Sequence, residues 1–553
     1  MQHTSTSNDA PARGEANEGR ENDSWFSRTI TPLSEIYMYV GISLFGFLLY
    51  ARTLFFDFTY FDDNVLVLDN LPFLQDWHNI FTTFTREVFH VLHGSAAYYR
   101  PLLTLSFMPD AIIGGASPAM YHFTNIIIHL IASCLLYALF RKLKYTKDIA
   151  IFSALIFVVH PVLTQAVAWV PGRNDSLLAL FVLASFITLI QYTETKRFVF
   201  AILSIFFFGC AIFTKETALV IPVVFFIYLY AKKVLNRSTV LKFGGGFTIV
   251  GLLWAILRHF ALKNPIPMSP SEMVQSVWNN TPASLQLLGK AFFPLNLSVL
   301  PIIQDTTFVW GAVALTIIVG LLVIEFVFYE KSRQENLLMM FFGAIWFCTF
   351  LFPSFIRPNP TAVADFIEHR LYLPIIGIMI FVIESRISTL LSRIQDDFIH
   401  AGLTIIILVF TFLTLVHASN FSNKLSFWKN AAETSPHSPL AQRNLGAMYY
   451  LDKEHDLAEE YFKKSLLLNK NEQMAHNNLG LLYMNRGEFR EAEREYKEEL
   501  LINPDYDNAY FNLGLLYYQT GKVEEAQKLW QRTLEINPEY EDARKALERA
   551  QNK

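Results

Sequence analysis

This sequence is poor in charge and in cysteine, and each shortage excludes a class of protein. Only 17% of its 553 residues are charged, whereas soluble domains contain about 25%. The net charge of -4 offers no basic surface of the kind that binds nucleic acid. Cys134, Cys210 and Cys348 all lie inside apolar runs, so we expect them to pack as small apolar residues. No Cys/His spacing typical of a zinc site occurs, so the sequence predicts no definite cofactor. Binding of a divalent metal ion by other residues is still compatible with the sequence.

Long apolar runs are what the sequence has in excess, with 52% hydrophobic residues and 50 Phe. Residues 1–33 are polar instead, which predicts a disordered cytoplasmic tail. Because about 20 apolar residues cross a bilayer as a helix, residues 34–420 are predicted to form a bundle of about 11 membrane spans. The expected spans are 36–55, 121–140, 149–168, 175–192, 197–213, 216–231, 242–260, 310–329, 337–355, 371–385 and 400–417.

The charges of the loops indicate how these spans are oriented. If the N-terminus is cytoplasmic, the five loops assigned to the inside are all basic, namely 141–147, 196–197, 232–242, 331–333 and 386–393. The outside loops are longer but carry only isolated basic residues. An odd number of spans then places the C-terminal part outside the cytoplasm. The sequence predicts a multi-pass protein in contact with membrane lipid, with an extracytoplasmic C-terminal arm.

The arm contains a repeat of 34 residues. Leu-Gly pairs recur at 445–446, 479–480 and 513–514, and an aromatic residue recurs at Phe462, Tyr496 and Trp530. This pattern is typical of tetratricopeptide repeats, in which each unit is a helical hairpin. We predict a linker at 421–438, then repeats at 439–472, 473–506 and 507–540 with a capping helix, which together form a domain over 439–553. The expected fold is all-α, a membrane helix bundle followed by an α-solenoid.

Asparagines recur at one position of the repeat, at Asn444, Asn478 and Asn512. On the concave face of a solenoid such amides could bind the backbone of a protein acceptor. Alternatively, they satisfy hydrogen bonds in turns or between helices.

Polar residues gather in the outside loops. Asp62 and Asp63 follow the first span directly, among aromatic residues. One carboxylate could act as a general base while the other positions a hydroxyl group or an ion, or the pair forms a solvated turn. Basic and imidazole groups occur in the other outside loops, at Arg100, Arg173, Lys215, Arg370, His160 and His369. Such a set could bind the phosphate of a lipid-linked substrate. Alternatively, these residues form ion pairs, such as Lys215 with Glu216, that only stabilise the ends of spans.

Several of these motifs, in this order, resemble those of the transmembrane-and-tetratricopeptide O-mannosyltransferases. The motifs are Tyr60-Phe61-Asp62-Asp63-Asn64, Arg100-Pro101, Tyr121-His122, His160-Pro161, Gly172-Arg173, Thr214-Lys215-Glu216-Thr217 and Glu368-His369-Arg370-Leu371-Tyr372, followed by the repeats. The resemblance implies a GT-C glycosyltransferase fold. It also implies inverting transfer of mannose or another hexose from a polyprenyl-phosphate-linked donor to Ser or Thr of a protein.

The resemblance also implies roles for residues. Asp62, ranked ahead of Asp63, would be the general base, and Arg100, Arg173, Lys215, Arg370, His160 and His369 would bind the donor phosphate. The arm has three clear repeats, fewer than animal members carry, which points to a prokaryotic relative and to the bacterial inner membrane rather than the endoplasmic reticulum.

Two other functions compete with the enzyme. One is a non-catalytic, membrane-anchored scaffold or assembly protein, in which the arm alone acts; the large first outside loop argues against this, because one span would suffice as an anchor. The other is a transporter, for which matching broken spans in two halves would be expected and are not evident.

Overall fold

The computed structural model describes residues 33–92, 98–262, 268–356, 365–387 and 395–551. The predicted disordered tail therefore lies outside the described residues except for Leu33. The chain divides into two units, residues 1–41 and 42–553. The first unit contributes the start of helix α1 (Leu33–Tyr50), and the second contains the rest of the bundle and the repeats. Within the described ranges the protein is all-α, apart from one isolated bridge between Ile302 and Asp365.

Seven helices are long and apolar enough to cross a membrane, or eight if the bent pair Lys147–Val159 and Pro161–Ala168 forms one span. The chain is thus an integral membrane protein, and seven or eight of the roughly 11 expected spans are long enough for a full crossing. All of the expected segments are helical, but three are short: Phe198–Thr214, Glu216–Ala231 and Pro374–Glu384. The extended backbone at Lys215 ends Phe198–Thr214 and separates it from Glu216–Ala231. The 3-10 turn at 368–371 precedes Pro374–Glu384, so this α-helix begins later than expected. The seven are Glu35–Phe55, Pro118–Lys142, Val170–Thr195, Arg237–Ala261, Val309–Val327, Lys331–Phe355 and Asp396–Phe421.

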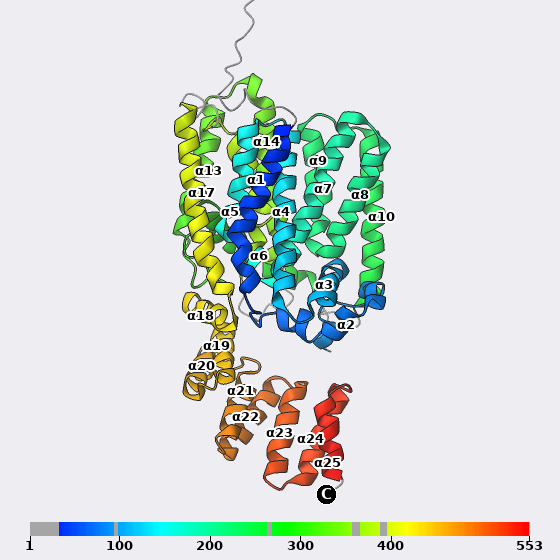
Figure 1. Cartoon of the computed structure of the whole chain (residues 1–553), viewed down its shortest axis with the longest axis vertical. Coiled ribbons are helices and arrows are strands. Elements are labelled where there is room, and N and C mark those ends of the chain that lie inside the picture. Colours follow the sequence, from blue (N-terminus) through cyan, green and yellow to red (C-terminus); the bar gives the residue numbers. More distant parts are fainter. Residues whose placement is uncertain (1–32, 93–97, 263–267, 357–364, 388–394, 552–553) are drawn as a thin grey trace, which may run out of the picture. The chain divides into compact units, whose positions relative to one another are not determined.

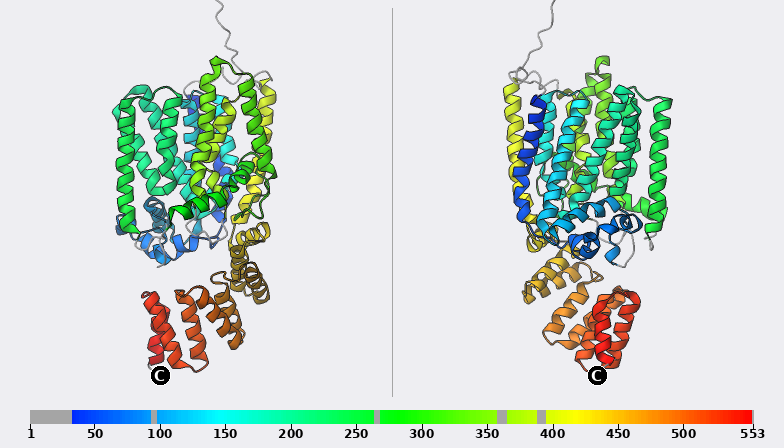
Figure 2. Two further views of the ribbon diagram at one scale, coloured as in Figure 1. Left: turned by 180° about the vertical axis from the view of Figure 1, so that it is seen from behind. Right: turned by 45° about the vertical axis from the view of Figure 1, so that its right-hand side comes forward.

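The helices of the bundle run side by side (Figure 1), and two further views show the same arrangement (Figure 2). Close packing depends locally on glycine: a Cβ on Gly343 would lie 2.5 Å from the Gly377 carbonyl oxygen, so α14 and α15 touch through their backbones. The helices of the bundle are α4 (Pro118–Lys142), α5 (Lys147–Val159), α6 (Gln165–Ala168), α7 (Arg173–Thr195), α8 (Phe198–Thr214), α9 (Ile221–Ala231), α10 (Arg237–Ala261), α12 (Ala283–Phe292), α13 (Val309–Val327), α14 (Gln334–Leu351), α15 (Pro374–Glu384) and α17 (Asp396–Ala418). Three shorter helices, α2 (Leu71–Gln75), α3 (Pro101–Gly114) and α11 (Pro270–Asn280), belong to the loops.

The basic loops meet at one end of this bundle. Lys142 binds Glu194 at 3.0 Å, Lys232 binds Glu335 at 2.7 Å, and the Tyr145 hydroxyl donates to Glu384 at 2.7 Å. Chain order separates this end from the polar loops: α8 starts next to Arg197 and ends next to Lys215. The two kinds of loop therefore occupy opposite ends of the bundle.

The repeats fold as helical hairpins with small residues at their contacts. A Cβ on Gly446, Gly480 or Gly514 would lie 2.8, 2.6 or 2.5 Å from the ring of the aromatic residue in the same repeat, so each glycine allows its two helices to touch. The helices are α19 (Pro439–Leu451), α20 (His455–Leu468), α21 (Ala475–Asn485), α22 (Phe489–Ile502), α23 (Asp507–Gln519), α24 (Val523–Ile536) and α25 (Glu541–Gln551).

The stretch expected as a linker, 421–438, contains a helix, α18 (Lys424–Thr434). The Asn423 side chain accepts a hydrogen bond from the Ser426 amide at 2.9 Å and caps its N-terminus. Phe427 and Trp428 are fully buried, in a cluster that includes Phe56 and Trp169 of the bundle and Leu445 of the first repeat. This stretch is therefore a packed junction.

Candidate active site

A cavity of about 790 Å³ lies at the end of the bundle opposite the basic loops. Its walls come from the loop after α1, the start of α3, the link between α8 and α9, the segment 365–370 and the end of α10. Asp62, Arg100, Lys215, His369 and Arg370 all line it. Five of the eight predicted catalytic and phosphate-binding residues, from four separate loops, therefore share one cavity.

Asp62 and Asp63 occupy different environments. Asp63 is fully buried, and its carboxylate accepts hydrogen bonds from the Thr59 amide (2.7 Å), the Thr59 hydroxyl (3.0 Å) and the Phe61 amide (3.0 Å). It holds the shape of its own loop. Asp62 lines the cavity, and its carboxylate makes no hydrogen bond within the described residues. Asp62 has a left-handed backbone, with φ of +64°, a conformation that strains a residue with a side chain.

The Asp62 carboxyl group has a pKa raised to about 7, chiefly because it is buried. The negative charges of Asp63 and Asp365 raise this pKa further, and Arg100 opposes them. A carboxylate with a pKa near neutrality accepts a proton far more readily than an ordinary aspartate does.

Among the described residues four cations line the cavity: Arg100, Lys215 and Arg370 each have a carboxylate partner, while Arg258 lies over the Trp254 ring. Arg100 Nε donates to Glu216 at 3.0 Å, Lys215 Nζ to Asp175 at 2.7 Å, and Arg370 to Asp365 at 3.0 Å. The alternative pair of Lys215 with Glu216 is therefore not the one that forms. Two basic groups converge on Asp175, because His369 Nε2 also lies 3.2 Å from it. Burial, followed by the charges of Lys215 and Arg370, keeps the His369 pKa well below 6.5, so its imidazole is neutral at pH 7.

Comparison with known proteins agrees with this arrangement. Residues 110–258 match a family described as dolichyl-phosphate-mannose-protein mannosyltransferase, and residues 480–521 and 507–540 match tetratricopeptide repeat families. The chain is thus similar to protein O-mannosyltransferases over part of its membrane bundle and to tetratricopeptide repeat proteins over its arm.

Two relatives show how far the similarity extends. The protein O-mannosyl-transferase tmtc2 of Xenopus laevis is 30% identical over 38% of this chain and 27% of its own length. The protein O-mannosyl-transferase F38B6.6 of Caenorhabditis elegans is 25% identical over 70% of this chain and 56% of its own length. The matches thus cover less than two thirds of these relatives. A solved structure, the first TPR of Spaghetti (RPAP3) bound to HSP90 peptide SRMEEVD, is 24% identical over 21% of this chain and 90% of that chain, with a TM-score of 0.20.

Two of the predicted phosphate-binding residues, Arg173 and His160, lie outside the cavity. Arg173 is fully buried, where it donates to Asp110 and Asn125 at 2.6 Å each and to the Ser106 and Tyr121 carbonyl oxygens. His160 is also buried, and its Nε2 donates to the Ala291 carbonyl oxygen at 3.1 Å. Both side chains join helices to one another, and we do not propose them as phosphate ligands.

The sequence interpretation missed the carboxylates that complete the site, Asp175, Glu216 and Asp365. Of these three, only Glu216 had been considered as an ion-pair partner, of its neighbour Lys215. A usable signal was present: each lies in an outside loop within five residues of a predicted cation. Counter-charges are to be expected where cations are buried at the end of a membrane helix.

The repeated asparagines differ from one another. Asn512 is buried and donates to Asn477 Oδ1 at 2.9 Å, a hydrogen bond between repeats. Asn444 Oδ1 accepts from Arg443 Nε at 3.3 Å, and Asn478 is partly exposed. Their predicted role in acceptor binding thus applies best to Asn478. Among the described residues, no group of three or more His, Cys, Asp or Glu could hold a metal ion.

Proposed function

We propose that this protein is a GT-C-type glycosyltransferase that moves mannose, or another hexose, from a polyprenyl-phosphate carrier to Ser or Thr of an extracytoplasmic protein. The observation that carries the proposal is Asp62: a carboxylate without a hydrogen bond among the described residues, with a pKa of about 7, in a cavity that is also lined by the cations Arg100, Lys215, Arg258 and Arg370. Similarity of residues 110–258 to dolichyl-phosphate-mannose-protein mannosyltransferases supports the chemical class.

In this reaction Asp62 accepts the proton of the acceptor hydroxyl group as its oxygen attacks C1 of the donor sugar. The C1–O bond to phosphate breaks, and its electron pair leaves with the phosphate. A single displacement of this kind inverts the anomeric centre. Asp63 acts by fixing the loop, since its own carboxylate is occupied by Thr59 and Phe61.

Arg100, Lys215 and Arg370 bind the donor phosphate in this proposal, and their attraction grows as charge develops on the leaving oxygen. Their carboxylate partners offset the cost of burying these charges and hold their side chains in place. One wall of the cavity is apolar, with Trp254, Met268 and Met273, and suits the isoprenoid chain of the carrier.

The proposal places the cavity on the extracytoplasmic face. The five basic loops lie at the opposite end of the bundle, and basic loops remain in the cytoplasm. The arm follows α17 on the side of the cavity, where its repeats would present the acceptor polypeptide.

The test compares Asp62→Asn with Asp69→Asn, a change of an exposed carboxylate in the same loop. Both variants are expressed, checked for membrane insertion, and assayed with polyprenyl-phosphate-mannose and a Ser/Thr peptide. We expect Asp62→Asn to reduce kcat by roughly 10²- to 10⁴-fold, the usual range for loss of a general base, and Asp69→Asn to have no effect. Full activity of Asp62→Asn would exclude it as the base. Absence of transfer by the wild type with a panel of lipid-linked sugars would favour the scaffold.

A further inference from the structure

The loop that carries Asp62 needs support from outside itself. Two of its residues have left-handed backbones, Tyr60 with φ of +58° and Asp62 with φ of +64°. Each such residue costs about 1–3 kcal/mol and persists only where the surroundings impose it. The Asp63 carboxylate supplies part of this support from within the loop.

The rest of the support comes through Phe61, the residue before Asp62. Its ring is stacked on Trp169 (centroids 5.3 Å apart) on the bundle and on Phe427 (5.7 Å) of α18, with the edge of Trp428 at 5.4 Å. Trp169 Nε1 also donates to the Phe61 carbonyl oxygen at 3.0 Å. Aromatic pairs of this kind contribute about 0.5–1.5 kcal/mol each beyond their buried area.

The α18 helix makes further contacts with the same loop. The Asp57 amide donates to the Ser422 carbonyl oxygen at 2.9 Å, just before α18, and Lys424 Nζ lies 5.5 Å from the centre of the Tyr60 ring. Contacts are thus made by three residues of the loop, 57, 60 and 61, before and within the strained stretch 60–62.

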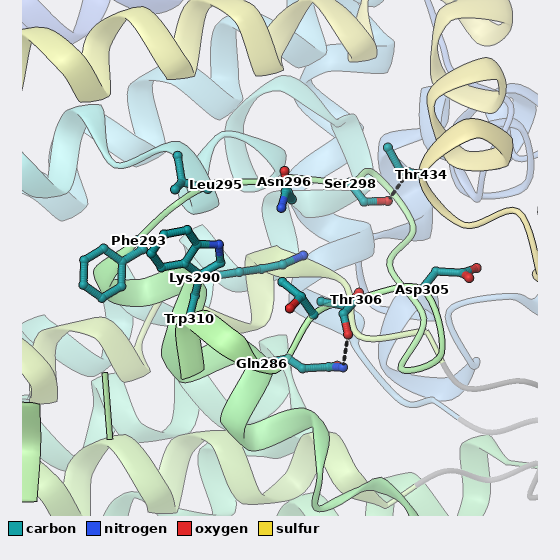
Figure 3. A pocket seen from close by; sticks show the side chains of 11 residues that line it. Gln286, Lys290, Phe293, Leu295, Asn296, Ser298, Asp305, Thr306, Trp310 and Thr434 are labelled. Carbon is teal, nitrogen blue, oxygen red and sulfur yellow. Dashed lines mark hydrogen bonds between the residues drawn. The ribbon is translucent and has the colours of Figure 1, made fainter. Parts of the chain in front are cut away.

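The α18 helix is itself fixed to the bundle at its other end. The Ser298 and Thr434 hydroxyl groups lie 2.6 Å apart, beside a small cavity of about 240 Å³ between α12, α13 and α18 (Figure 3). The Val299 amide donates to Asn430 Oδ1 at 3.1 Å, and the Ser435 hydroxyl donates to the Leu300 carbonyl oxygen at 2.8 Å. A helix held at both ends can impose a position on the ring that it contacts.

We infer that Phe427 and Trp428 of α18 are positioning residues for Asp62, which they hold in the cavity through Phe61. This inference rests on the proposed function and makes the base of the repeat arm part of the active site. Neither residue touches the cavity, so both act only through Phe61. Since misplacement of a catalytic group by about 1 Å can reduce a rate by about 10²-fold, a gap beside Phe61 is sufficient to slow transfer.

The test uses matched substitutions of two buried phenylalanines, Phe427→Leu in α18 and Phe462→Leu in the first repeat. Phe462 is equally buried but packs against Gly446 and belongs to the core of the repeats, away from Phe61. With a short Ser/Thr peptide as acceptor, we expect Phe427→Leu to reduce kcat on the order of tenfold, with little change in the KM for the donor. Phe462→Leu should leave kcat unchanged. Trp428→Phe, which keeps an aromatic ring, should retain more activity than Trp428→Leu.

A second measurement does not need turnover. A water-soluble carbodiimide labels carboxyl groups in their protonated form, and mass spectrometry of the peptide that contains Asp62 gives the pH at which labelling is half complete, with Asp62→Asn as the blank. Phe427→Leu should shift this pH, and Phe462→Leu should not. Identical labelling and kcat in the two leucine variants would overturn the inference. A shift in labelling together with a wild type that transfers no sugar would instead refute the proposed function and leave the positioning contact intact.

Discussion

At the scale of single residues, the division of roles between Asp62 and Asp63 depends on which way the backbone turns. Left-handed backbone at Tyr60 and Asp62 directs one carboxylate into the cavity, while the other accepts three hydrogen bonds from its own loop. The two residues are chemically identical in the sequence. The sequence places the pair among aromatic residues after the first span, and the family resemblance ranked Asp62 first, but the hydrogen bonds that occupy Asp63 could not be read from it.

The raised pKa of Asp62 predicts a pH dependence for both activity and stability. The base must be ionised, so transfer should rise with pH through a midpoint near the pKa of about 7. The stability of the fold should change in the opposite direction. Because the folded state holds this proton more tightly than the unfolded state, whose pKa is 3.8, the contribution of Asp62 to stability is present below about pH 4 and lost as pH rises to 7.

Rate profiles and thermal midpoints of the wild type and Asp62→Asn at pH 5 and pH 8 check this dependence. Asp62→Asn should raise the thermal midpoint relative to the wild type more at pH 8 than at pH 5, although it is inactive. An acidic limb of the rate profile centred near pH 4 would show that Asp62 titrates as an ordinary aspartate.

At the scale of helices, Arg173 joins three elements. From the start of α7 its guanidinium binds Asp110 and the Ser106 carbonyl oxygen on α3, and Asn125 and the Tyr121 carbonyl oxygen on α4. Its exposed fraction is 0%, and that of the Asp110 side chain is 2%. We therefore expect Arg173→Met to destabilise the protein by about 3–5 kcal/mol, because it leaves the buried Asp110 without a cation.

The double variant Arg173→Met with Asp110→Leu separates this role from phosphate binding. Removal of both charges should restore much of the lost thermal stability, and the KM for the donor should stay close to that of the wild type. If the double variant is stable but its donor KM rises as much as that of Arg100→Met, Arg173 is a phosphate ligand after all.

Most helices of the bundle could be predicted from the sequence, but the points where the short ones begin and end, and the junction with the repeats, could not. Apolar runs located the long spans and the short helices α8, α9 and α15, because composition alone shows that a run is apolar, but they did not indicate α12. The break at Lys215 is accompanied by ion pairs of Lys215 with Asp175 and of Glu216 with Arg100, and the turn at 368–371 by an ion pair of Glu368 with Lys290. These partners lie far apart in the sequence, so the pairs could not be predicted from it. The α18 helix was not predicted because the 34-residue pattern begins after it. Asn423, a residue type common at helix N-caps, and the adjacent aromatic residues Phe427 and Trp428 were available as signals in the sequence.

At the scale of the whole molecule, the boundary between the bundle and the repeats is a shared core. One cluster includes Phe56, Trp169 and Ile367 of the bundle, Phe427 and Trp428 of α18, and Leu445 and Met448 of the first repeat. A second core, centred on Phe462 of the first repeat and Tyr496 of the second, joins the first repeat to the later ones and, among the described residues, includes none from the bundle. The arm thus has two parts with different dependence on the bundle: α18 and the first repeat, and the repeats beyond them.

Two deletions are expected to separate these parts. Deletion of 473–540 removes two whole repeats and joins the capping helix α25 to the first repeat in the same register, since 473 and 541 both follow a repeat boundary. This variant should keep its kcat for a short peptide and lose kcat/KM for a full-length protein acceptor. Deletion of 424–553 also removes Phe427 and Trp428, and should reduce kcat for the short peptide by tenfold or more, on the order expected for a displaced base. If the second deletion transfers mannose to the short peptide as fast as the first, the bundle holds Asp62 by itself and the arm serves only to bind acceptor.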